Sequence, residues 1–433
     1  MRDFGRSDDP RVQAQLDRLA ALSLPQGRFG LDTIRALMER LGSPHRKLPP
    51  VFHVAGTNGK GSTCAFLRAM LEAQGYRVHV TTSPHLVRYN ERIRLAGELI
   101  SDAELAATLQ EVLDAGEDLG PSFFEVTIAA AFLAFSRTPA DVCVVEVGMG
   151  GRFDATNVLE PEALVACGIA ALGLDHERFL LATEDGVPQE PMARIAFEKA
   201  GIAKRGVPLV TQHTYPPEAK VAIREVAARS GALLYEGPYG CWASEDQAAL
   251  VVDDYYNEAQ LFPSLPGEHQ GNNLCLAISM LLHQQKVAVS ERAIIDGAKA
   301  ARWPARLQRL LPGPLTVLGP NATIWLDGGH NPSAGAAIAE ALKGPLHLVI
   351  GMIEGKDPLA IIDPLAGRIR TLQVVPVPGH DWQLVEAFGP EARAAANVEE
   401  ALLRIPDDDF PILIAGSLYL AGEVLRLNDE LPD

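Results

Sequence analysis

The chain has 433 residues, of which 47% are hydrophobic and 21% are charged, and this composition is typical of a globular protein. With 55 acidic and 38 basic residues, its formal net charge of −17 argues against nucleic acid or an anionic membrane as a partner. At about 150 residues per domain, the length indicates two or three domains.

Other features of the composition exclude further classes. Five scattered cysteines in apolar surroundings, with no C-x-x-C pair, indicate neither a disulfide framework nor a zinc site. The charges between Arg2 and Arg11 predict that no signal peptide is present, and no apolar run reaches about 18 residues. We therefore expect a cytoplasmic protein that does not span a membrane.

The first elements surround a glycine-rich turn. Apolar residues at three-to-four spacing predict helices over residues 10–41, interrupted by a turn at residues 27–31. A strand at residues 50–54 and a helix at residues 64–73 then flank the sequence AGTNGKGST at residues 55–63. Glycines let backbone N–H groups approach phosphate, and Lys60 and the helix N-terminus add positive charge, so we predict a phosphate-binding loop.

The spacing of this loop departs from the pattern G-x-x-x-x-G-K-[ST]. Val54 stands where that pattern has its first glycine, and Gly61 separates Lys60 from Ser62. An ordinary glycine-rich turn between a strand and a helix is therefore the alternative.

Alternating strands and helices continue to about residue 300. Strands are predicted at residues 77–81, 142–147 and 163–170, and helices at residues 102–113 and 123–135, the first opened by a capping box at Ser101 to Glu104. Such alternation favours a parallel sheet covered on both faces, with ligands at the carboxyl ends of its strands. Residues 56–62, 82–85, 146–152 and 175–176 are all expected at that edge.

Glu146 is a candidate magnesium ligand on the residues alone. It ends a buried strand and precedes a mobile glycine loop, and Mg²⁺ prefers a few hard oxygen ligands completed by water and phosphate. A strand-end carboxylate that simply faces solvent is the alternative.

A second αβ series follows a break at residues 302–306. Strands at residues 323–326, 347–350, 372–375 and 412–415 alternate with helices that begin near Ser333, Asp357 and Val398. We predict an α/β protein: a P-loop parallel-sheet ATPase domain at residues 1–300, followed by a smaller Rossmann-like α/β domain at residues 301–433.

The motifs resemble those of a known family. AGTNGKGS at residues 55–62, followed by TSPHL at residues 82–86, is similar to the Mur-type amino-acid ligases, and within them to the folylpolyglutamate synthase/dihydrofolate synthase branch. Further matches recur in family order from Gly30 to Ser417. The resemblance implies an ATP-dependent ligase that adds L-glutamate to dihydropteroate, forming dihydrofolate, and to the γ-glutamyl tail of reduced folates, through an acyl phosphate. It implies ATP and two Mg²⁺ ions and leaves open a K⁺ ion in the second domain. We expect a monomeric enzyme, a state that the sequence itself does not determine.

The resemblance also implies roles for individual residues. The catalytic set is Lys60, His176, a carbamylated Lys199 and Arg306. The expected magnesium ligands are Ser83, Glu146, His176 and Lys199. The expected ATP contacts are Gly56, Thr57, Asn58, Gly59, Lys60, Gly61, Ser62, Asn273, Arg306, Asp327 and His330. The pterin pocket is assigned to Ser122, Phe123, Phe124, Glu125, Arg152 and Ala155.

The chain departs from the family pattern in three places. The segment at residues 177–195, between His176 and Lys199, is longer than usual. Ala305 and Gly329 replace a glycine and an alanine, and we expect both replacements to be tolerated.

Two other functions remain as alternatives. A cell-wall Mur ligase shares the chemistry, but the inserted Gly61 and the SPHL, EKAGI and DxxHNP motifs argue against it. A nucleotide-dependent switch would need no amino-acid acceptor.

For the ligase, the site motifs in the second domain predict that the two domains close about a hinge when ATP binds.

Overall fold

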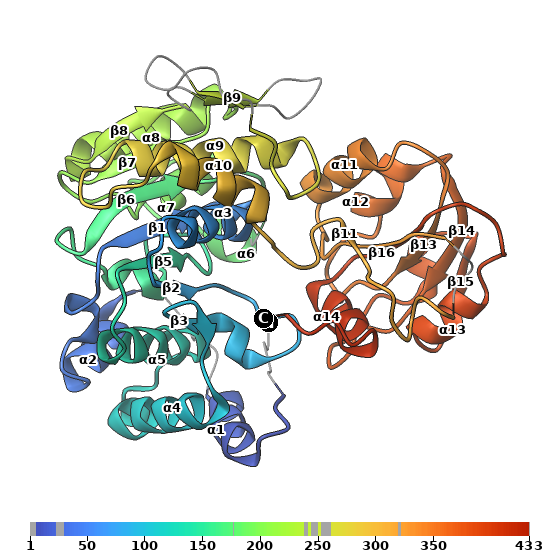
Figure 1. Cartoon of the computed structure of the whole chain (residues 1–433), viewed down its shortest axis with the longest axis horizontal. Coiled ribbons are helices and arrows are strands. Elements are labelled where there is room, and N and C mark those ends of the chain that lie inside the picture. The colour runs from blue at the N-terminus through green and yellow to red at the C-terminus, as the bar shows by residue number, and fades with distance from the viewer. Residues whose placement is uncertain are drawn as a thin grey trace. The chain divides into compact units, whose positions relative to one another are not determined.

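The computed structural model describes residues 6–22, 30–175, 177–237, 241–243, 250–252, 261–318 and 322–432. The chain separates into two compact units, each described here by itself (Figure 1). The first unit comprises Met1–Pro84, Arg88–Ser264 and Gln270–Arg302, and the second comprises His85–Val87, Leu265–His269 and Trp303–Asp433.

The described part of the first unit contains an eight-stranded sheet with the order β4-β3-β2-β5-β1-β6-β7-β8. Its strands are β1 Val51–Ala55, β2 Val78–Thr81, β3 Ile93–Leu95, β4 Glu98–Leu99, β5 Val142–Glu146, β6 Leu164–Ile169, β7 Pro208–Thr211 and β8 Leu233–Glu236. A separate antiparallel pair is formed by β9 Cys241–Ala243 and β10 Leu250–Val252. The helices are α1 Pro10–Ala21, α2 Asp32–Arg40, α3 Lys60–Ala73, α4 Asp102–Gly116, α5 Phe123–Arg137, α6 Glu177–Leu180, α7 Pro191–Ala200, α8 Pro217–Ser230, α9 His269–Leu282 and α10 Glu291–Ala300.

Parallel pairing brings the predicted motifs to one edge of this sheet. Strands β2, β5, β1 and β6 are neighbours and run parallel. Every residue of β1 and β5 is buried, which explains why both are apolar apart from His53 in β1 and Glu146 at the end of β5. In the β1–β5 pair, Val54 lies opposite Glu146, so the loop after β1 begins beside that carboxylate.

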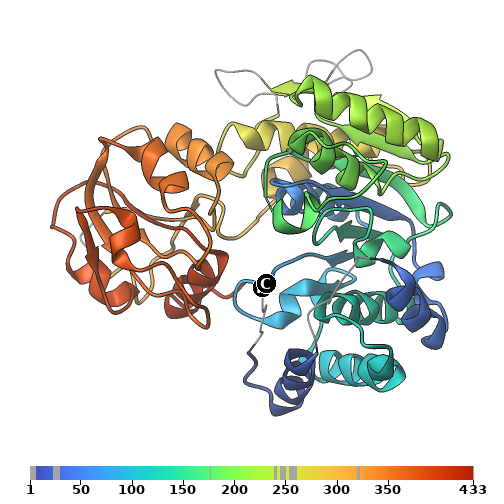
Figure 2. The ribbon, with the colours of Figure 1, turned by 180° about the vertical axis from the view of Figure 1, so that it is seen from behind.

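Helices cover both faces of the sheet. Consecutive residues of β6 point to opposite faces: the Cys167 thiol donates to the carbonyl oxygen of Ile202, just after α7, at 3.5 Å. A Cβ at the next residue, Gly168, would lie 2.3 Å from the sulfur of Met280 in α9. Helices α3 and α10 lie with α9 in front of the sheet in Figure 1, whereas α7 and α8 face the viewer in Figure 2.

The described part of the second unit has a six-stranded sheet with the order β11-β12-β16-β13-β14-β15, parallel except at β11. Its strands are β11 Gln308–Arg309, β12 Ile324–Leu326, β13 Leu346–Ile350, β14 Ile369–Val374, β15 Ala392–Ala394 and β16 Ile412–Ala415. Its helices are α11 Pro332–Ala341, α12 Leu359–Ile362, α13 Val398–Leu403 and α14 Leu418–Leu427. Apolar residues on both faces of this sheet form two core clusters. The predicted α/β fold, with a second α/β element series, is confirmed.

Candidate active site

The glycine-rich loop after β1 is shaped by Gly59. Its φ of 80° lies in the left-handed region that favours glycine. A Cβ at Gly59 would stand 2.3 Å from Oδ1 of Asn273 in α9, so the loop and this helix meet where no side chain fits. Helix α3 begins at Lys60, earlier than predicted, and Gly61 and Ser62 are buried in its first turn. The first N–H groups of a helix lack partners within it, so this end suits an anion.

Lys60 turns back over the loop. Its Nζ donates to the carbonyl oxygens of Gly56 at 3.1 Å and of Thr57 at 3.3 Å. The Thr57 hydroxyl donates to the carbonyl oxygen of Gly173 at 2.9 Å, and the N–H groups of Thr57 and Asn58 donate to a neighbouring carbonyl after β6. The loop is therefore tied to the segment that follows β6.

Lys199 reaches the same loop from the last turn of α7. It is buried, and its Nζ donates to the carbonyl oxygen of Gly56 at 2.9 Å, so this carbonyl accepts from Lys60 and Lys199 together. Burial, followed by the charge of Lys60, lowers the pKa of Lys199 to about 7 despite three nearby carboxylates. In a large fraction of the molecules, the Lys199 side chain is therefore an uncharged amine near neutral pH.

Ser83 and Glu146 lie together at the ends of neighbouring strands. The Ser83 N–H donates to Oε2 of Glu146 at 3.1 Å, and Glu146 is buried. A carboxylate with an adjacent hydroxyl-bearing residue fits Mg²⁺, which takes few protein ligands when phosphate and water supply the rest. Among the described residues, no three His, Cys, Asp or Glu side chains gather as a metal site. Of the other two expected ligands, Lys199 is described above and His176 lies outside the described residues.

A buried carboxylate stands behind the loop that follows β5. Asp154 accepts hydrogen bonds from the N–H of Met149 at 2.8 Å and from the hydroxyl of Thr156 at 2.5 Å. Burial raises its pKa, although these hydrogen bonds oppose the shift. Ala155, an expected pterin contact, is buried at the start of the short helix Ala155–Val158, and Arg152 binds Glu198 at 2.8 Å.

The four expected pterin residues at the start of α5 divide into two groups. A Cβ at Gly148 would lie 2.3 Å from the ring of Phe124, so this ring packs directly on the loop after β5. Phe123 instead meets Tyr89 edge to face, with ring centroids 6.0 Å apart.

Ser122 and Glu125 form a reciprocal capping box. The Ser122 N–H donates to Glu125 Oε2 at 2.8 Å, and the Glu125 N–H donates to Ser122 Oγ at 3.2 Å. Both side chains therefore hold the start of α5.

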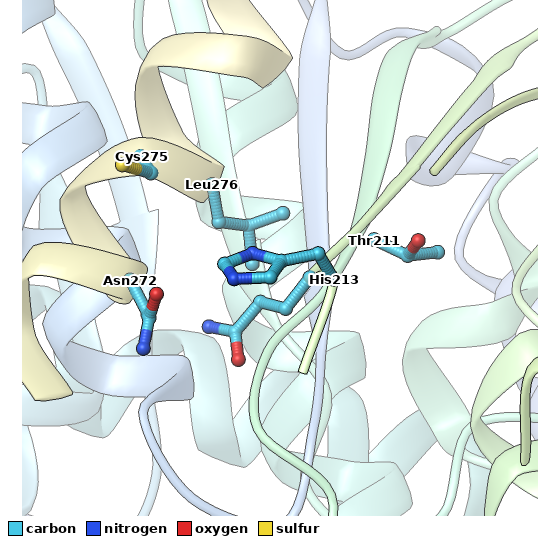
Figure 3. A pocket seen from close by; sticks show the side chains of 6 residues that line it. Thr211, His213, Asn272, Cys275 and Leu276 are labelled. Atoms are coloured by element: carbon cyan, nitrogen blue, oxygen red, sulfur yellow. The ribbon is translucent and has the colours of Figure 1, made fainter. Parts of the chain in front are cut away.

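A shallow surface hollow with no enclosed room for a water molecule lies beside Asn273, the expected adenine contact. Asn273 is buried; its Nδ2 donates to Gln270 Oε1 at 3.0 Å, and Gln212 Nε2 lies 3.5 Å from its Oδ1. Figure 3 shows the hollow between the end of β7 and α9. Its lining residues are Thr211, Gln212, His213, Asn272, Cys275 and Leu276.

In the second unit, the expected ATP contacts Asp327 and His330 belong to one loop after β12. Asp327 accepts from the N–H groups of Leu307 at 2.8 Å and Gly329 at 2.7 Å. Burial raises its pKa, while Arg306 opposes that shift. The His330 ring Nδ1 lies 3.3 Å from the carbonyl oxygen of Gly328.

The two replacements in the second unit have different local consequences. Ala305 adopts a φ of 56°, a strained value for a residue with a Cβ. A Cβ at Gly329 would lie 2.7 Å from Oδ1 of Asp327 and 2.6 Å from Ala334 Cβ. Glycine at this position avoids both clashes.

Comparisons with known proteins identify the group to which these residues belong. The chain is 38% identical over 436 residues to a dihydrofolate synthase/folylpolyglutamate synthase of Bacillus subtilis, covering 92% of this chain and 94% of that protein. The chain belongs to the folylpolyglutamate synthase/dihydrofolate synthase family. No protein-family model matches the chain.

Solved structures of family members share the fold. Escherichia coli FolC in complex with DHPP and ADP has a TM-score of 0.81 at 28% identity, covering 96% of this chain and 97% of that one. A bifunctional folylpolyglutamate synthase/dihydrofolate synthase of Yersinia pestis, complexed with AMPPNP and a Mn ion, has a TM-score of 0.80 at 29% identity with the same coverage.

Three polar residues that lie beside the expected contacts were not predicted from the sequence. Asp154 could have been found, because it stands within the motif GGRFDATN that also contains Arg152 and Ala155. Gln212 and His213 follow β7, a short strand that begins with proline and gives little sequence signal.

In the described part of the chain, no helix combines the length and apolarity that crossing a membrane requires.

Proposed function

We propose that this chain is an ATP-dependent ligase that joins L-glutamate to dihydropteroate and to the γ-glutamyl tail of reduced folates. Its membership of the folylpolyglutamate synthase/dihydrofolate synthase family supports this function. The observation that carries it is a glycine loop whose Gly56 carbonyl accepts from both Lys60 and the buried Lys199, beside the Ser83–Glu146 pair. A simple phosphate-binding loop would have no need of a second, buried amine.

The reaction proceeds in two steps. The acceptor carboxylate attacks the γ-phosphorus of ATP, ADP leaves, and an acyl phosphate forms. The α-amino group of L-glutamate then attacks the acyl carbon, loses a proton, and phosphate leaves from the tetrahedral intermediate as the amide bond forms. Most of the catalysis is positioning and charge neutralisation, because the protein forms no covalent bond in either step.

The residues of the first unit are assigned to different parts of the ATP–Mg²⁺ complex. Lys60 and the amides at residues 56–62 are assigned to the phosphates, and Asn273 is assigned to the adenine. Mg²⁺, when bound, neutralises phosphate charge. Ser83 and Glu146 would hold the first ion, and His176 with a carbamylated Lys199 would hold the second. The neutral amine of Lys199 supports this assignment, since only an unprotonated amine adds to CO₂.

The acceptor is assigned to the loop after β5 and the start of α5. The ring of Phe124, packed on Gly148, offers a flat apolar surface to a pterin. Arg152 and Ala155 flank this loop, and Ser122 and Glu125 contribute by fixing the helix that carries Phe124.

The second unit completes the proposal. We assign residues 1–300 to the ATP-binding domain and residues 301–433 to a domain that serves glutamate and nucleotide. Arg306, Asp327 and His330 are assigned to the nucleotide on their family motifs. We further propose a monomeric, cytoplasmic enzyme, and an effect of K⁺ on turnover would support a monovalent cation in the second domain.

Glutamate-dependent ADP release, with dihydropteroate and tetrahydrofolate offered separately, tests the function. Turnover with both acceptors is the expected result. Turnover with tetrahydrofolate alone would leave a chain-lengthening enzyme and remove the pterin pocket at Phe124. Release with neither acceptor would contradict the proposal and favour a cell-wall ligase or a nucleotide switch.

A further inference from the structure

Two arginines of the first unit converge on the carboxylate of Glu184. Arg152 binds it through two guanidinium nitrogens, Nη1 to Oε1 at 3.0 Å and Nη2 to Oε2 at 2.5 Å. Arg194 adds a contact from Nη2 to Oε2 at 2.9 Å. The Arg194 side chain is 6% exposed, and those of Arg152 and Glu184 are 21% and 24% exposed. Paired arginine–carboxylate contacts of this kind are among the stronger charged hydrogen bonds.

A second carboxylate completes the cluster. Arg152 donates to Glu198 at 2.8 and 3.1 Å, and Arg194 Nε lies 3.1 Å from Glu198 Oε1. The Arg152 guanidinium also lies over the ring of Phe153, 4.2 Å from its centroid, which fixes its plane. Two positive and two negative charges cancel, and without Glu184 one positive charge would be left over. Arg152 and Arg194 together therefore form a carboxylate clamp that the chain fills with its own side chain.

Glu184 belongs to the segment at residues 177–195, which was expected from the sequence to be longer than in the family. This segment touches the loop after β5 at two points, because Glu184 binds Arg152 and Leu180 packs on Gly150, where a Cβ would lie 3.0 Å from Leu180 Cδ2. The same loop carries Gly148, on which Phe124 packs. Residues 177–195 contain four acidic residues and two basic ones, Arg178 and Arg194, so the segment has a net charge of −2. An acidic segment is thus docked on the loop assigned to the acceptor.

We propose that Glu184 determines acceptor specificity by filling this two-arginine clamp, which disfavours acceptors whose γ-glutamyl tails carry additional carboxylates. The inference rests on the proposed function. Dihydropteroate brings one carboxylate, the reacting one, whereas each γ-glutamyl residue adds an α-carboxylate that needs a cation or water as partner. With the clamp filled, the tail finds no free arginine there and meets the negative charge of the segment.

Steady-state kinetics of Glu184→Gln with dihydropteroate, tetrahydrofolate and tetrahydrofolate triglutamate test this assignment. Glutamine keeps the shape of Glu184 and removes its charge. We expect the KM for the triglutamate to fall roughly three- to fivefold relative to that for dihydropteroate, the scale of one partly exposed ion pair. The KM for ATP and the kcat with dihydropteroate should not change.

Two further variants serve as controls. Asp185→Asn removes the same charge from the next residue, which is exposed, and should leave the ratio of the two KM values at its wild-type level. Glu184→Asp retains a carboxylate and should restore much of the wild-type discrimination. An unchanged ratio in Glu184→Gln, or the same change in Asp185→Asn, would overturn the inference.

Salt dependence separates specificity from a purely structural role. In Glu184→Gln the vacated clamp binds the tail by charge, so the KM for the triglutamate should rise between about 50 and about 300 mM KCl. Equal changes for every acceptor and for ATP would show that Glu184 only maintains the fold, and would refute the proposal. If Glu184→Gln fails to fold, the wild-type enzyme decides: its triglutamate KM should stay flat or fall with salt, and a rise would refute a filled clamp.

Failure of the Glu184 inference can also be distinguished from failure of the proposed ligase function. A wild-type enzyme without glutamate-dependent turnover on any acceptor would remove the ligase function and this inference together. A wild-type enzyme that turns over all three acceptors, with Glu184→Gln showing the same preference, would remove the inference alone.

Discussion

Replacing Lys199 by methionine should stabilise the protein while abolishing ligase activity. Methionine fills similar space without a charge. The pKa of Lys199 is lowered from 10.5 to about 7, chiefly by burial. The unfolded chain therefore holds this proton more tightly than the folded chain, and folding is penalised wherever the unfolded side chain is charged.

The size of the penalty follows from the two pKa values. At about 1.36 kcal/mol per pKa unit, it is about 4 kcal/mol at pH 7, about 3 at pH 8 and about 1 at pH 9.5. Its sign is fixed: the penalty is fully present below pH 7 and disappears as the pH rises towards 10.5. Lys199→Met should exceed the wild type in free energy of unfolding by these amounts.

Urea unfolding followed by circular dichroism, in buffer free of CO₂, measures this difference. At pH 7 about half of the Lys199 side chains are neutral, against about one in three thousand for an ordinary lysine, so added bicarbonate should activate and stabilise the wild type by forming the carbamate. Bicarbonate should change neither property of Lys199→Met. A stability difference that does not vary with pH, or a Lys199→Met variant with full ligase activity, would refute the reasoning.

Four other substitutions test separate parts of the site. Lys60→Ala should reduce kcat by roughly 10²- to 10³-fold in ADP-release assays, since one charge on the phosphates is lost; full activity would refute the phosphate-loop assignment. Phe124→Leu should raise the KM for dihydropteroate about fivefold and leave that for ATP unchanged, while an unaltered KM would exclude stacking on this ring. Glu146→Gln should raise the Mg²⁺ concentration for half-maximal activity by about tenfold or more, and an unshifted Mg²⁺ titration would contradict its role as a ligand. Ala305→Gly should increase the free energy of unfolding by about 1 kcal/mol because it relieves a φ of 56°; a loss of stability would show that this strain is already compensated.

The sequence was most informative where burial and chemistry coincide. β1 and β5 are buried along their whole length, so each is mostly apolar, with His53 the exception within β1, and each is followed by a polar or glycine-rich motif. Parallel pairing then places the loop at Gly56 beside Glu146 without any knowledge of side-chain contacts. For this reason the sheet edge could be predicted as the site.

Short strands and local caps were less visible. β7 has four residues and begins with Pro208, so the residues that line the hollow after it gave no periodic signal. The pattern S-x-x-E occurs twice, and the capping box was predicted at the first copy, Ser101 to Glu104. The structure gives the reciprocal capping box to Ser122 and Glu125, and at Ser101 the hydrogen bond from the Glu104 N–H.

Long-range polar contacts were beyond pattern analysis. Arg152 and Glu184 are 32 residues apart and pair only because the loop after β5 and the segment before α7 fold against each other. The low pKa of Lys199 likewise depends on burial beneath the glycine loop, a property of the assembled unit. Neither residue type nor spacing contains this information.

The pairing of β1 with β5 has a consequence for synthesis of the protein. Val54 and Glu146 face each other across a parallel pair, and a register slip of one residue would turn the carboxylate to the opposite face of the sheet. The Lys199 amine that meets Gly56 lies 143 residues further along the chain. During translation the glycine loop is complete long before either partner emerges. Fragments released before residue 199 therefore lack the Lys199 amine even where they contain Glu146, and on the proposed function we expect such a fragment not to consume ATP.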